Sequence, residues 1–406
     1  MSIHSAPRAP ASPSPGHASG FNAPAFSLHA ADDIGTLARC VLQGPSLDTP
    51  LGEHRLALVD PTPERLAVAS RIVARGVPHA GPRGIWFQPR GKHIASGKCA
   101  FLFPGVDNRP LPNLDDVSRH FAGPPPPQPG IDPGDTLARS RQSMESGILL
   151  DHAMRQLGVR PDGRAGLSCG EWAALTVTGG FVNVAPLLDY RRAGLPLPNL
   201  VYLAAAINAN VLREILATTQ RMADVAVSHE NSPSQSVACG PIEDIGRLRE
   251  ILQSKGVITQ ELAVRSGFHV PAFAPHVDAM LGFLELEARP PNSEVWSCVS
   301  ATPFPAERSG CSQLLRRHFV EPVNFLRLVR AMHADDYRVF VELGSGALCA
   351  MVADTLDGMP HVAVPAAHHS RPGLESLQRA LLALWTTHVG VDPFALAPHP
   401  RALAVS

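Results

Sequence analysis

The stretch AGLSCGEWAAL, residues 165–175, joins a short apolar run to a helix-forming run through a serine. Ser168 stands between Gly166 and Gly170. Small residues two before and two after a serine let the chain turn sharply from a strand into a helix, which leaves the hydroxyl exposed. The N–H groups that begin such a helix favour negative charge beside the serine. Two interpretations stay open at this point: Ser168 is a nucleophile, or it is an ordinary helix N-cap.

Apolar runs on both sides of this stretch indicate a parallel sheet. CAFLF (99–103) ends at Pro104-Gly105, and RAGLS (164–168) ends at the serine. SEVWSCVS (293–300) and RVFVEL (338–343) are further runs of this type. Short apolar runs that alternate with helical segments are typical of parallel strands covered by helices. We therefore predict an α/β fold built on a parallel sheet.

Changes in composition and pattern divide the chain into segments. Residues 201–263 follow the order β-α-ββ-α-β, which predicts an inserted ferredoxin-like subdomain. The start of the chain is rich in Pro, Ala and Ser, which is typical of disorder. The predicted units are a disordered tail (1–25), a small α/β linker-like domain (26–97), a large subdomain (98–200 and 264–373), the insertion (201–263), and a C-terminal helix and tail (374–406).

The composition excludes several classes of protein. The chain has 406 residues, 45% of them hydrophobic, and a formal net charge of −1, so no nucleic-acid partner is expected. Its seven cysteines include no CxxC pair, which favours reduced thiols in a cytoplasmic protein. No apolar run reaches the ~18 residues that cross a bilayer, so no membrane partner is expected. The adjacent His368 and His369 lack partners at metal-ligand spacing, so no metal is predicted.

Six motifs in one order point to a known family. They are FLFPG, GLSCGEWAAL, ENSPSQSVACG, RSGFHVPAFAP, HFVEPVNF and VFVELGSGAL. Together, over about residues 98–373, they resemble the acyl-carrier-protein transacylase family, which comprises malonyl-CoA:ACP transacylases and the acyltransferase domains of polyketide synthases. The resemblance implies an α/β-hydrolase-like core that carries the ferredoxin-like subdomain. Residues 26–97 resemble the linker region that precedes such domains in large synthases.

The resemblance also implies a catalytic dyad. Ser168 would attack the thioester of an acyl-CoA, and His269 in the GFHVP motif would be its base, since a serine hydroxyl needs one at neutral pH. The backbone carbonyl of His318 would orient this histidine. We expect only the main chain of His318 to matter and its side chain to be solvated.

Two backbone N–H groups are expected to form the oxyanion hole of this dyad. The resemblance assigns them to Cys169, directly after the nucleophile, and to Val106, directly after FPG. Family members usually carry Gln-Gly-Ser-Gln where this chain reads Val-Asp-Asn-Arg (106–109), so a glutamine side chain is lost while the backbone donor remains. Leu167 replaces the histidine that usually precedes the serine.

Other positions bear on the substrate. Malonyl-type enzymes place an arginine on the helix after the serine to hold a carboxylate, and that position falls on Ala193 here. Arg191 or Arg192 could take that role, or both could be solvated side chains near a surface turn. Without such a clamp a neutral acyl group is expected. In the family, the residue directly before the histidine correlates with the substituent on the acyl chain, and the resemblance implies that Phe268 favours an unbranched chain. Asn231 and Gln235 are expected to line the cleft between the subdomains, although Asn231 could instead cap a turn.

Three functions fit these residues. The first is a free-standing acyltransferase that moves an acyl group from acyl-CoA through an acyl-O-serine to the phosphopantetheine thiol of an acyl carrier protein, in trans, for a polyketide or fatty-acid synthase. The second is an acyl-thioester hydrolase of the same fold that clears carrier proteins, and the third is a catalytically weak docking module. No bound cofactor is expected: acyl-CoA is the donor substrate, and phosphopantetheine belongs to the partner carrier protein. The acyl group, the carrier protein and the oligomeric state are left open.

Overall fold

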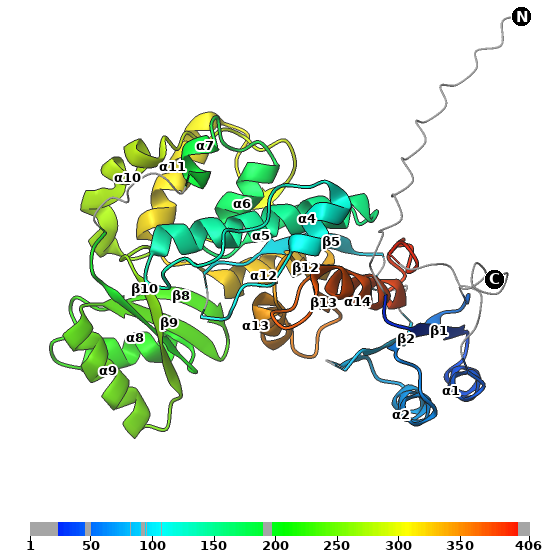
Figure 1. The fold of residues 1–406 in the computed structure, drawn as a ribbon. Helices are drawn as coiled ribbons and strands as arrows, with labels where there is room; N and C mark the ends of the chain where they lie inside the picture. Colours follow the sequence, from blue (N-terminus) through cyan, green and yellow to red (C-terminus); the bar gives the residue numbers. More distant parts are fainter. Residues whose placement is uncertain are drawn as a thin grey trace, which may run out of the picture.

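The structure is a computed structural model whose strands form three sheets within the described residues (Figure 1). The described residues are 23–44, 50–81, 83–90, 94, 96–106, 108–189 and 197–396. Most of the tail predicted over 1–25 and the last ten residues of the chain lie outside these ranges.

A parallel sheet forms the centre of the main body, in the order β11-β6-β5-β12-β13. Every pair of neighbouring strands in it is parallel, as the sequence predicted. The edge strand β13 was not predicted, because its sequence, VAVP, is short and ends in a proline. The strands are β5 (Lys98–Phe103), β6 (Gly163–Gly166), β11 (Val295–Trp296), β12 (Tyr337–Glu342) and β13 (Val362–Pro365).

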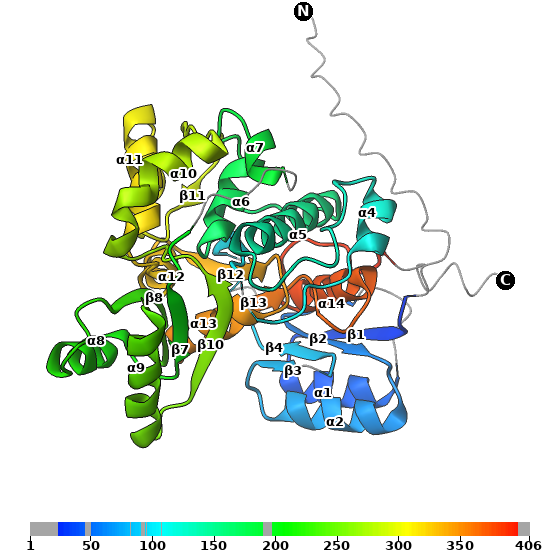
Figure 2. The same ribbon diagram turned by 60° about the vertical axis from the view of Figure 1, so that its left-hand side comes forward.

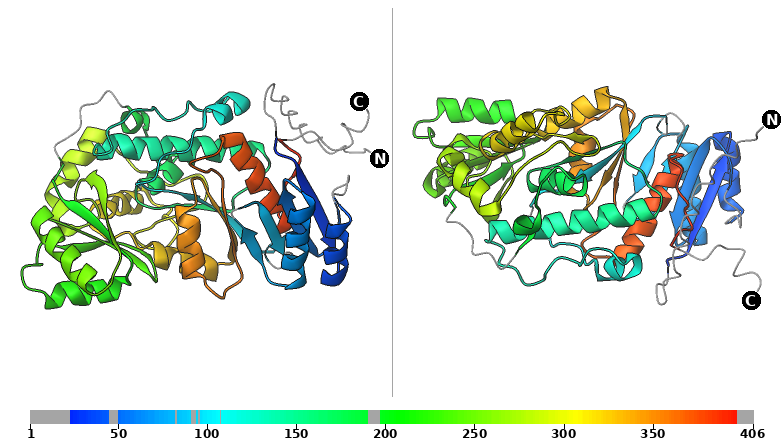
Figure 3. Two further views of the ribbon diagram at one scale, coloured as in Figure 1. Left: turned by 60° about the horizontal axis from the view of Figure 1, so that its bottom comes forward. Right: turned by 90° about the horizontal axis from the view of Figure 1, so that it is seen from above.

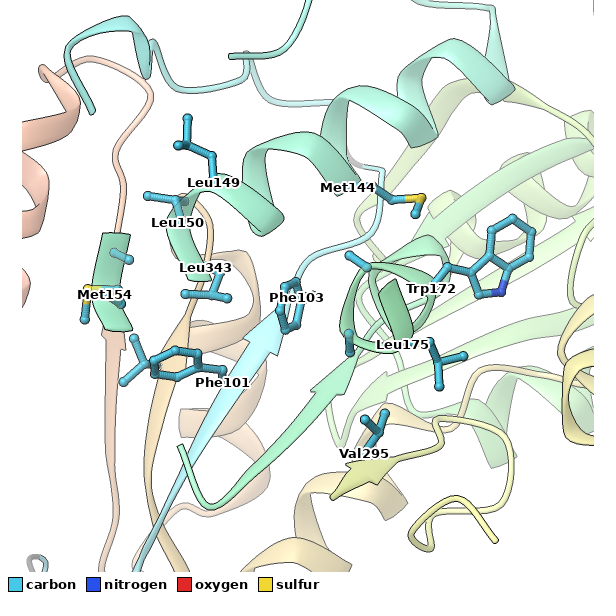
Figure 4. Packing of buried hydrophobic residues seen from close by; sticks show 14 of the residues in the cluster. Phe101, Phe103, Met144, Leu149, Leu150, Met154, Trp172, Leu175, Val295 and Leu343 are labelled. Atoms are coloured by element: carbon cyan, nitrogen blue, oxygen red, sulfur yellow. The ribbon is translucent and has the colours of Figure 1, made fainter. Parts of the chain in front are cut away.

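Helices cover both faces of this sheet, because side chains alternate between the faces along each strand. Phe101 and Phe103 of β5 pack under α5 and α6, as Figure 4 shows. Ala100 and Leu102 of the same strand face α12 and α13. The helices of the main body around this sheet are α4 (Asp115–Phe121), α5 (Thr136–Gln156), α6 (Cys169–Val177), α7 (Ala185–Leu188), α12 (Phe325–Ala334), α13 (Ala347–Thr355) and α14 (Gly373–Thr386).

The insertion is an antiparallel sheet with two helices, in the strand order β10-β7-β9-β8. In the insertion's own numbering this is 4-1-3-2, which is the ferredoxin-like order. The backbone of Val323 in the main body exchanges hydrogen bonds with Ser228 and Glu230, so β8 runs beside the main body. The elements are β7 (Val201–Ala205), α8 (Ala209–Thr218), β8 (Ala226–Ser232), β9 (Gln235–Gly240), α9 (Ile242–Ser254) and β10 (Thr259–Arg265).

After the insertion the chain returns to the main body through a short helical region. This region comprises the 3-10 helix η1 (Pro271–His276) and α10 (Val277–Leu284), and α11 (Arg308–Val320) follows after strand β11. The last turn of α11 lies over the first turn of α6, where Phe319 and His318 contact Trp172. Segments far apart in the sequence therefore meet at the start of α6.

The N-terminal unit is an antiparallel sheet, in the order β1-β2-β4-β3. Helices α1 and α2 cover one face, and α14 of the main body covers the other, where Leu382 and Trp385 pack against Leu28 (Figure 2). This unit and the insertion lie at opposite ends of the main body (Figure 3). Its elements are β1 (Phe26–Ala31), α1 (Ile34–Leu42), β2 (His54–Val59), α2 (Pro63–Ala74), β3 (His79–Gly81) and β4 (Ile85–Gln88).

No helix within the described residues combines the length and the hydropathy needed to span a bilayer.

Candidate active site

Ser168 occupies a strained turn between β6 and α6, with φ 54° and ψ −124°. The neighbouring glycines are required because backbones approach closely here. A Cβ on Gly166 would lie 2.1 Å from the carbonyl carbon of Gly170, and a Cβ on Gly170 would lie 2.1 Å from the carbonyl oxygen of Phe103. Ser168 occupies the N-cap position, but its side chain makes no capping hydrogen bond. The turn therefore presents the hydroxyl outward, away from the helix.

The Ser168 hydroxyl meets the imidazole of His269. Its Oγ atom lies 2.7 Å from Nε2, while Nδ1 of the same ring lies 2.7 Å from the carbonyl oxygen of His318. A carbonyl only accepts, so Nδ1 carries the proton and Nε2 is left to accept from the hydroxyl. The His269 backbone N–H also donates to the carbonyl of Phe319, at 2.8 Å. Two bonds to the end of α11 thus fix the ring in the orientation of a general base.

The electrostatics around His269 favour its neutral form. Burial lowers its pKa well below the usual value, and positive charge on His318 or His229 acts in the same direction. The hydrogen bond to the His318 carbonyl opposes the shift and is the weaker influence. At neutral pH the ring is therefore unprotonated and can accept a proton from Ser168.

The side chain of His318 is not solvated, which corrects the sequence-based expectation. It is 2% exposed, and its Nδ1 lies 3.3 Å from Oε1 of Glu171, which is 1% exposed. The other carboxylate oxygen accepts from the backbone N–H of Cys298 at 2.5 Å. The physical reason is that the last turn of α11 packs onto the first turn of α6. Glu171 is the single acid in the apolar run CGEWAALTV, and this pattern could have indicated a buried carboxylate with a specific partner.

Glu171, Cys298 and His318 offer ligand atoms within 4.8 Å of one another, the spacing of a metal site. The Cys298 sulfur lies 4.0 Å from Nδ1 of His318, the same atom that faces Glu171. Each of the three side chains already has a partner. The Glu171 carboxylate contacts His318 and the Cys298 backbone N–H, and the Cys298 sulfur contacts His318. That the chain holds no metal stays a prediction.

His229 of β8 packs beside His269. Its ring centroid lies 5.0 Å from that of His269, edge to face, and its Nδ1 is 2.9 Å from the Ser228 hydroxyl. Burial, assisted by the charge of His318, lowers the pKa of His229 to about 3. Nothing in the sequence near His229 marks it, because its position depends on β8 running beside the main body.

The loop after β5 lies directly against Ser168. A Cβ on Gly105 would lie 2.7 Å from the carbonyl oxygen of Leu167 and 3.4 Å from Cβ of Ser168. The hydroxyl of Ser143 on α5 lies 3.0 Å from the carbonyl oxygens of both Pro104 and Gly105, which fixes this loop. Val106 thus follows a loop that is held in place beside Ser168.

Cys169 begins α6, so its N–H is one of those without a partner inside the helix. Burial raises the pKa of its thiol to about 11, while hydrogen bonding to the thiol by Ser140 and by the Val106 backbone N–H acts in the opposite direction. Val106 and Cys169 therefore adjoin each other beside Ser168. Their role as oxyanion donors stays a prediction.

Phe268 lies among aromatic rings beside the base. Its ring centroid is 4.7 Å from that of Phe273 and 5.8 Å from that of Phe319, and its carbonyl accepts from the Tyr202 hydroxyl at 3.0 Å. These contacts anchor the ring next to His269.

Asn231 and Gln235 face each other across the end of the β8–β9 hairpin. The Asn231 amide donates to Oε1 of Gln235 at 2.9 Å, while the buried Oδ1 of Asn231 has no hydrogen-bond partner among the described residues. The hydroxyl of Ser232, rather than Asn231, accepts from the turn at Ser234. Arg191 and Arg192 lie outside the described residues.

The sequence family follows from comparison with known proteins. The acyl transferase domain family matches residues 148–392. This range covers more than half of the chain, and the chain therefore belongs to the acyl transferase domain family. It is an acyltransferase of the type found in polyketide and fatty-acid synthases.

Curated relatives are large synthases. The chain is 30% identical over 263 residues to orsellinic acid synthase of Emericella nidulans, an alignment that covers 60% of the chain and 12% of the relative. It is 32% identical over 217 residues to a polyunsaturated fatty acid synthase polypeptide of Thraustochytrium sp., covering 50% of the chain and 7% of the relative. The matched region thus spans about a tenth of the length of these relatives.

Solved structures share the fold. The acyltransferase domain from module 8 of the salinomycin polyketide synthase aligns with a TM-score of 0.70 at 19% identity, covering 92% of this chain and 98% of that domain. The malonyl CoA-acyl carrier protein transacylase of Clostridium perfringens aligns with a TM-score of 0.60 at 20% identity, covering 72% of this chain and 98% of the enzyme. At these identities the likeness establishes the fold.

Proposed function

We propose that this acyltransferase moves an acyl group from an acyl-CoA, through an ester on Ser168, to the phosphopantetheine thiol of an acyl carrier protein. The observation that carries the proposal is the continuous contact from the Ser168 hydroxyl to Nε2 of His269, and from Nδ1 to the carbonyl of His318, each at 2.7 Å. A nucleophile, a base and a group that orients the base are the parts that nucleophilic acyl transfer requires.

The first half-reaction acylates the serine. Nε2 of His269 takes the hydroxyl proton as the Ser168 oxygen bonds to the thioester carbon. The tetrahedral intermediate places its negative oxygen toward the N–H groups of Val106 and Cys169, each worth about 3–4 kcal/mol to such a charge. When the carbon–sulfur bond breaks, the departing CoA sulfur takes the proton from Nε2.

The second half-reaction is the reverse with a different thiol. The phosphopantetheine thiol gives its proton to Nε2, its sulfur bonds to the acyl carbon, and the bond to the Ser168 oxygen breaks. The serine oxygen then takes the proton back from His269. The neutral ring that burial favours is the form that both half-reactions need at their start.

We assign a positioning role to the Glu171–His318 pair. It joins the first turn of α6, which follows the nucleophile, to the last turn of α11, which supplies the carbonyl that orients the base. Neither side chain is expected to touch the substrate. Their contact instead keeps the separation between Ser168 and His269 constant.

The acyl group we propose is neutral and unbranched. Phe268 lies beside His269, and we expect its bulk to disfavour a branch next to the reacting carbonyl. A free malonyl carboxylate would need Arg191 or Arg192 as its partner. Asn231 and Gln235, which hydrogen-bond to each other at the end of the β8–β9 hairpin, are the residues that we expect to line the cleft between the subdomains.

The proposal is tested by intact-mass measurement of the protein after exposure to single acyl-CoAs. The panel comprises acetyl-, butyryl-, octanoyl-, malonyl- and methylmalonyl-CoA. We expect a mass increase of one acyl group with the neutral unbranched thioesters, absent in Ser168→Ala. His269→Ala should slow acylation on the order of 10³-fold. Near-normal acylation of His269→Ala would show that the base is wrongly assigned.

A second step distinguishes the transferase from the alternatives. A separately purified holo acyl carrier protein is added to the acylated protein, with its apo form as the control. Transfer to the holo form alone supports the proposal and its action in trans. Rapid loss of the acyl group as free acid would favour the hydrolase, and a complete lack of labelling at Ser168 would favour a docking module.

A further inference from the structure

The main body holds the inserted sheet along both of its edges. The edge strands of this sheet are β8 and β10. The edge of β8 hydrogen-bonds to the backbone of Val323, as described above. At β10, the side-chain amide of Asn108, in the loop after β5, donates to the carbonyl of Glu261 at 3.1 Å and accepts from the backbone N–H of Ala263 at 3.2 Å. The loop after β5 is therefore attached to β10.

The amide of Asn108 binds β10 in the way that a neighbouring strand would. Residues 261 and 263 are two apart, so their backbone groups lie on the same side of an extended strand. The amide offers one donor and one acceptor, and Glu261 and Ala263 present the complementary carbonyl and N–H. The pairing of β10 with β7 shifts its register between Glu261 and Arg265. Asn108 thus binds an irregular part of the strand, where the ladder to β7 is disrupted.

Thr136, the first residue of α5, makes a second attachment to β10. Its hydroxyl donates to the carbonyl of Arg265 at 2.8 Å and accepts from the backbone N–H of Arg265 at 3.1 Å. Helix α5 also fixes the loop after β5, through the contacts of Ser143 described above. The helix, the loop and β10 are therefore joined to one another.

The chain runs from β10 to His269 in a short, anchored segment. Strand β10 ends at Arg265, and His269 follows four residues later. The hydroxyl of Tyr202, on β7, lies 2.8 Å from the Ser266 hydroxyl and donates to the carbonyl of Phe268 at 3.0 Å. A shift of β10 would therefore displace the ring of His269.

Asn108 joins the two segments that carry the proposed oxyanion donor and the proposed base. It follows Val106 by two residues, and the strand that it holds leads to His269. We propose that Asn108 is a positioning residue, which fixes the distance between the Val106 N–H and the imidazole of His269. This inference rests on the acyl transfer proposed above. Asn108 is exposed and acts through its loop and β10.

Loss of these two hydrogen bonds should affect the transition state more than the bound substrate. The negative oxygen forms only as Ser168 attacks, and Val106 and His269 must be in place at that moment. A misplacement of about 1 Å at a reacting group can slow a reaction on the order of 10²-fold. Because Asn108 is exposed, its replacement should leave the fold intact.

The test compares Asn108→Leu with the wild-type protein. Leucine has a similar size and makes neither hydrogen bond. Single-turnover acylation by butyryl-CoA should slow at least tenfold, while KM changes less than twofold. Asn113→Leu is the matched control, because Asn113 is an exposed asparagine of the same loop that accepts from the backbone N–H of Asp115 instead. Its acylation rate should be unchanged.

A pair of CoA analogues distinguishes positioning from a general loosening of the cleft. The first is trifluoroacetonyl-CoA: its ketone carbon bonds to the Ser168 oxygen while Nε2 of His269 takes the hydroxyl proton, which leaves a negative oxygen for the oxyanion donors. The second is propyl-CoA, a thioether without a carbonyl. Asn108→Leu should weaken binding of the ketone at least tenfold and that of the thioether less than twofold. Equal losses for both would overturn the positioning role.

The wild-type protein separates a failure of this inference from a failure of the proposed function. If the wild type is not acylated by the acyl-CoA panel and does not bind the ketone, the acyl transfer itself is wrongly proposed. If the wild type is acylated and Asn108→Leu is acylated at the same rate, only the positioning role of Asn108 is overturned.

Discussion

Nδ1 of His318 lies 3.3 Å from a carboxylate oxygen of Glu171, and both side chains are almost fully buried. The contact joins two helices that the sequence separates by more than a hundred residues. Because the His318 carbonyl holds the ring of His269, this contact connects the position of His269 to that of Ser168. Substitution of either residue allows the effect of this contact on stability and on the acylation rate to be measured.

Removal of either member of the pair should cost both stability and rate. Glu171→Ala and His318→Ala each leave a buried polar partner uncompensated, which lowers the free energy of unfolding by about 3 kcal/mol. The loosened α11 carbonyl should slow acylation about tenfold with little change in KM. Urea unfolding and single-turnover acylation measure the two effects.

The conservative variant His318→Asn serves as the control for this prediction. An asparagine amide can place its nitrogen near the position of Nδ1, so most of the stability and of the rate should return. If His318→Asn is as slow as His318→Ala, the imidazole has a role beyond positioning.

Gly105→Ala should impair acylation without unfolding the protein. The new Cβ would lie 2.7 Å from the carbonyl oxygen of Leu167, so the loop that carries Val106 must move away from Ser168. Loss of one oxyanion donor lowers the rate about 10²-fold. Single-turnover acylation and circular dichroism check the rate and the fold.

Gly246→Ala in α9 is the matched control for the glycine prediction. A Cβ there meets nothing within 4 Å, and alanine is the better helix former by up to about 1 kcal/mol. Its acylation rate should be unchanged and its stability equal or higher. If Gly105→Ala is acylated at the normal rate, the position of this loop does not matter for acylation.

Stability should fall as the pH drops below about 6.5, the value for histidine in an unfolded chain. The pKa of buried His229 is lowered to about 3. Between pH 6.5 and 3 this histidine is therefore protonated in the unfolded state but neutral in the native state, which favours unfolding. The free energy of unfolding is not reduced by His229 above pH 6.5, and it falls progressively as the pH drops below this value. From pH 7 to 5, His229 alone should account for about 2 kcal/mol.

Urea unfolding at several pH values measures this loss, and His229→Gln tests its origin. Glutamine does not titrate, so the slope of stability against pH should decrease by the share assigned to His229. His29, whose pKa burial lowers to about 4, contributes in the same direction and remains in the variant. An unchanged slope in His229→Gln would contradict the assignment.

The acylation rate should stay nearly constant from pH 8 down to about 6.5. Burial and neighbouring charge keep the pKa of His269 well below its usual value, so the base remains neutral across this range. The acid limb of kcat/KM against pH therefore lies well below 6.5. Stopped-flow or quenched acylation over short times, before acid unfolding begins, provides the measurement.

Local patterns in the sequence predicted some parts of this molecule and not others. The apolar runs that end at Pro104 and at Ser168 predicted parallel strands, because a buried strand is readable from its own residues. The motif order assigned Ser168 and His269, and the structure brings these two side chains together. Their catalytic roles remain predictions.

The parts that were missed depend on contacts between distant segments. His318 was expected to be a solvated helix residue, whereas its side chain is buried because α11 packs on α6. His229 reaches the base through the backbone pairing of β8 with Val323. No local pattern contains either contact.

Helix α14 belongs to two hydrophobic cores at once. Leu377 and Leu381 pack into the core of the main body, whereas Leu382 and Trp385 pack against the N-terminal sheet, where Arg55 donates to the Trp385 carbonyl at 3.0 Å. A truncated protein that starts near residue 98 would keep the helix but leave its Leu382–Trp385 side uncovered in water. The N-terminal sheet therefore shields an apolar face of α14 from water. A shortened protein without this sheet should aggregate when it is expressed.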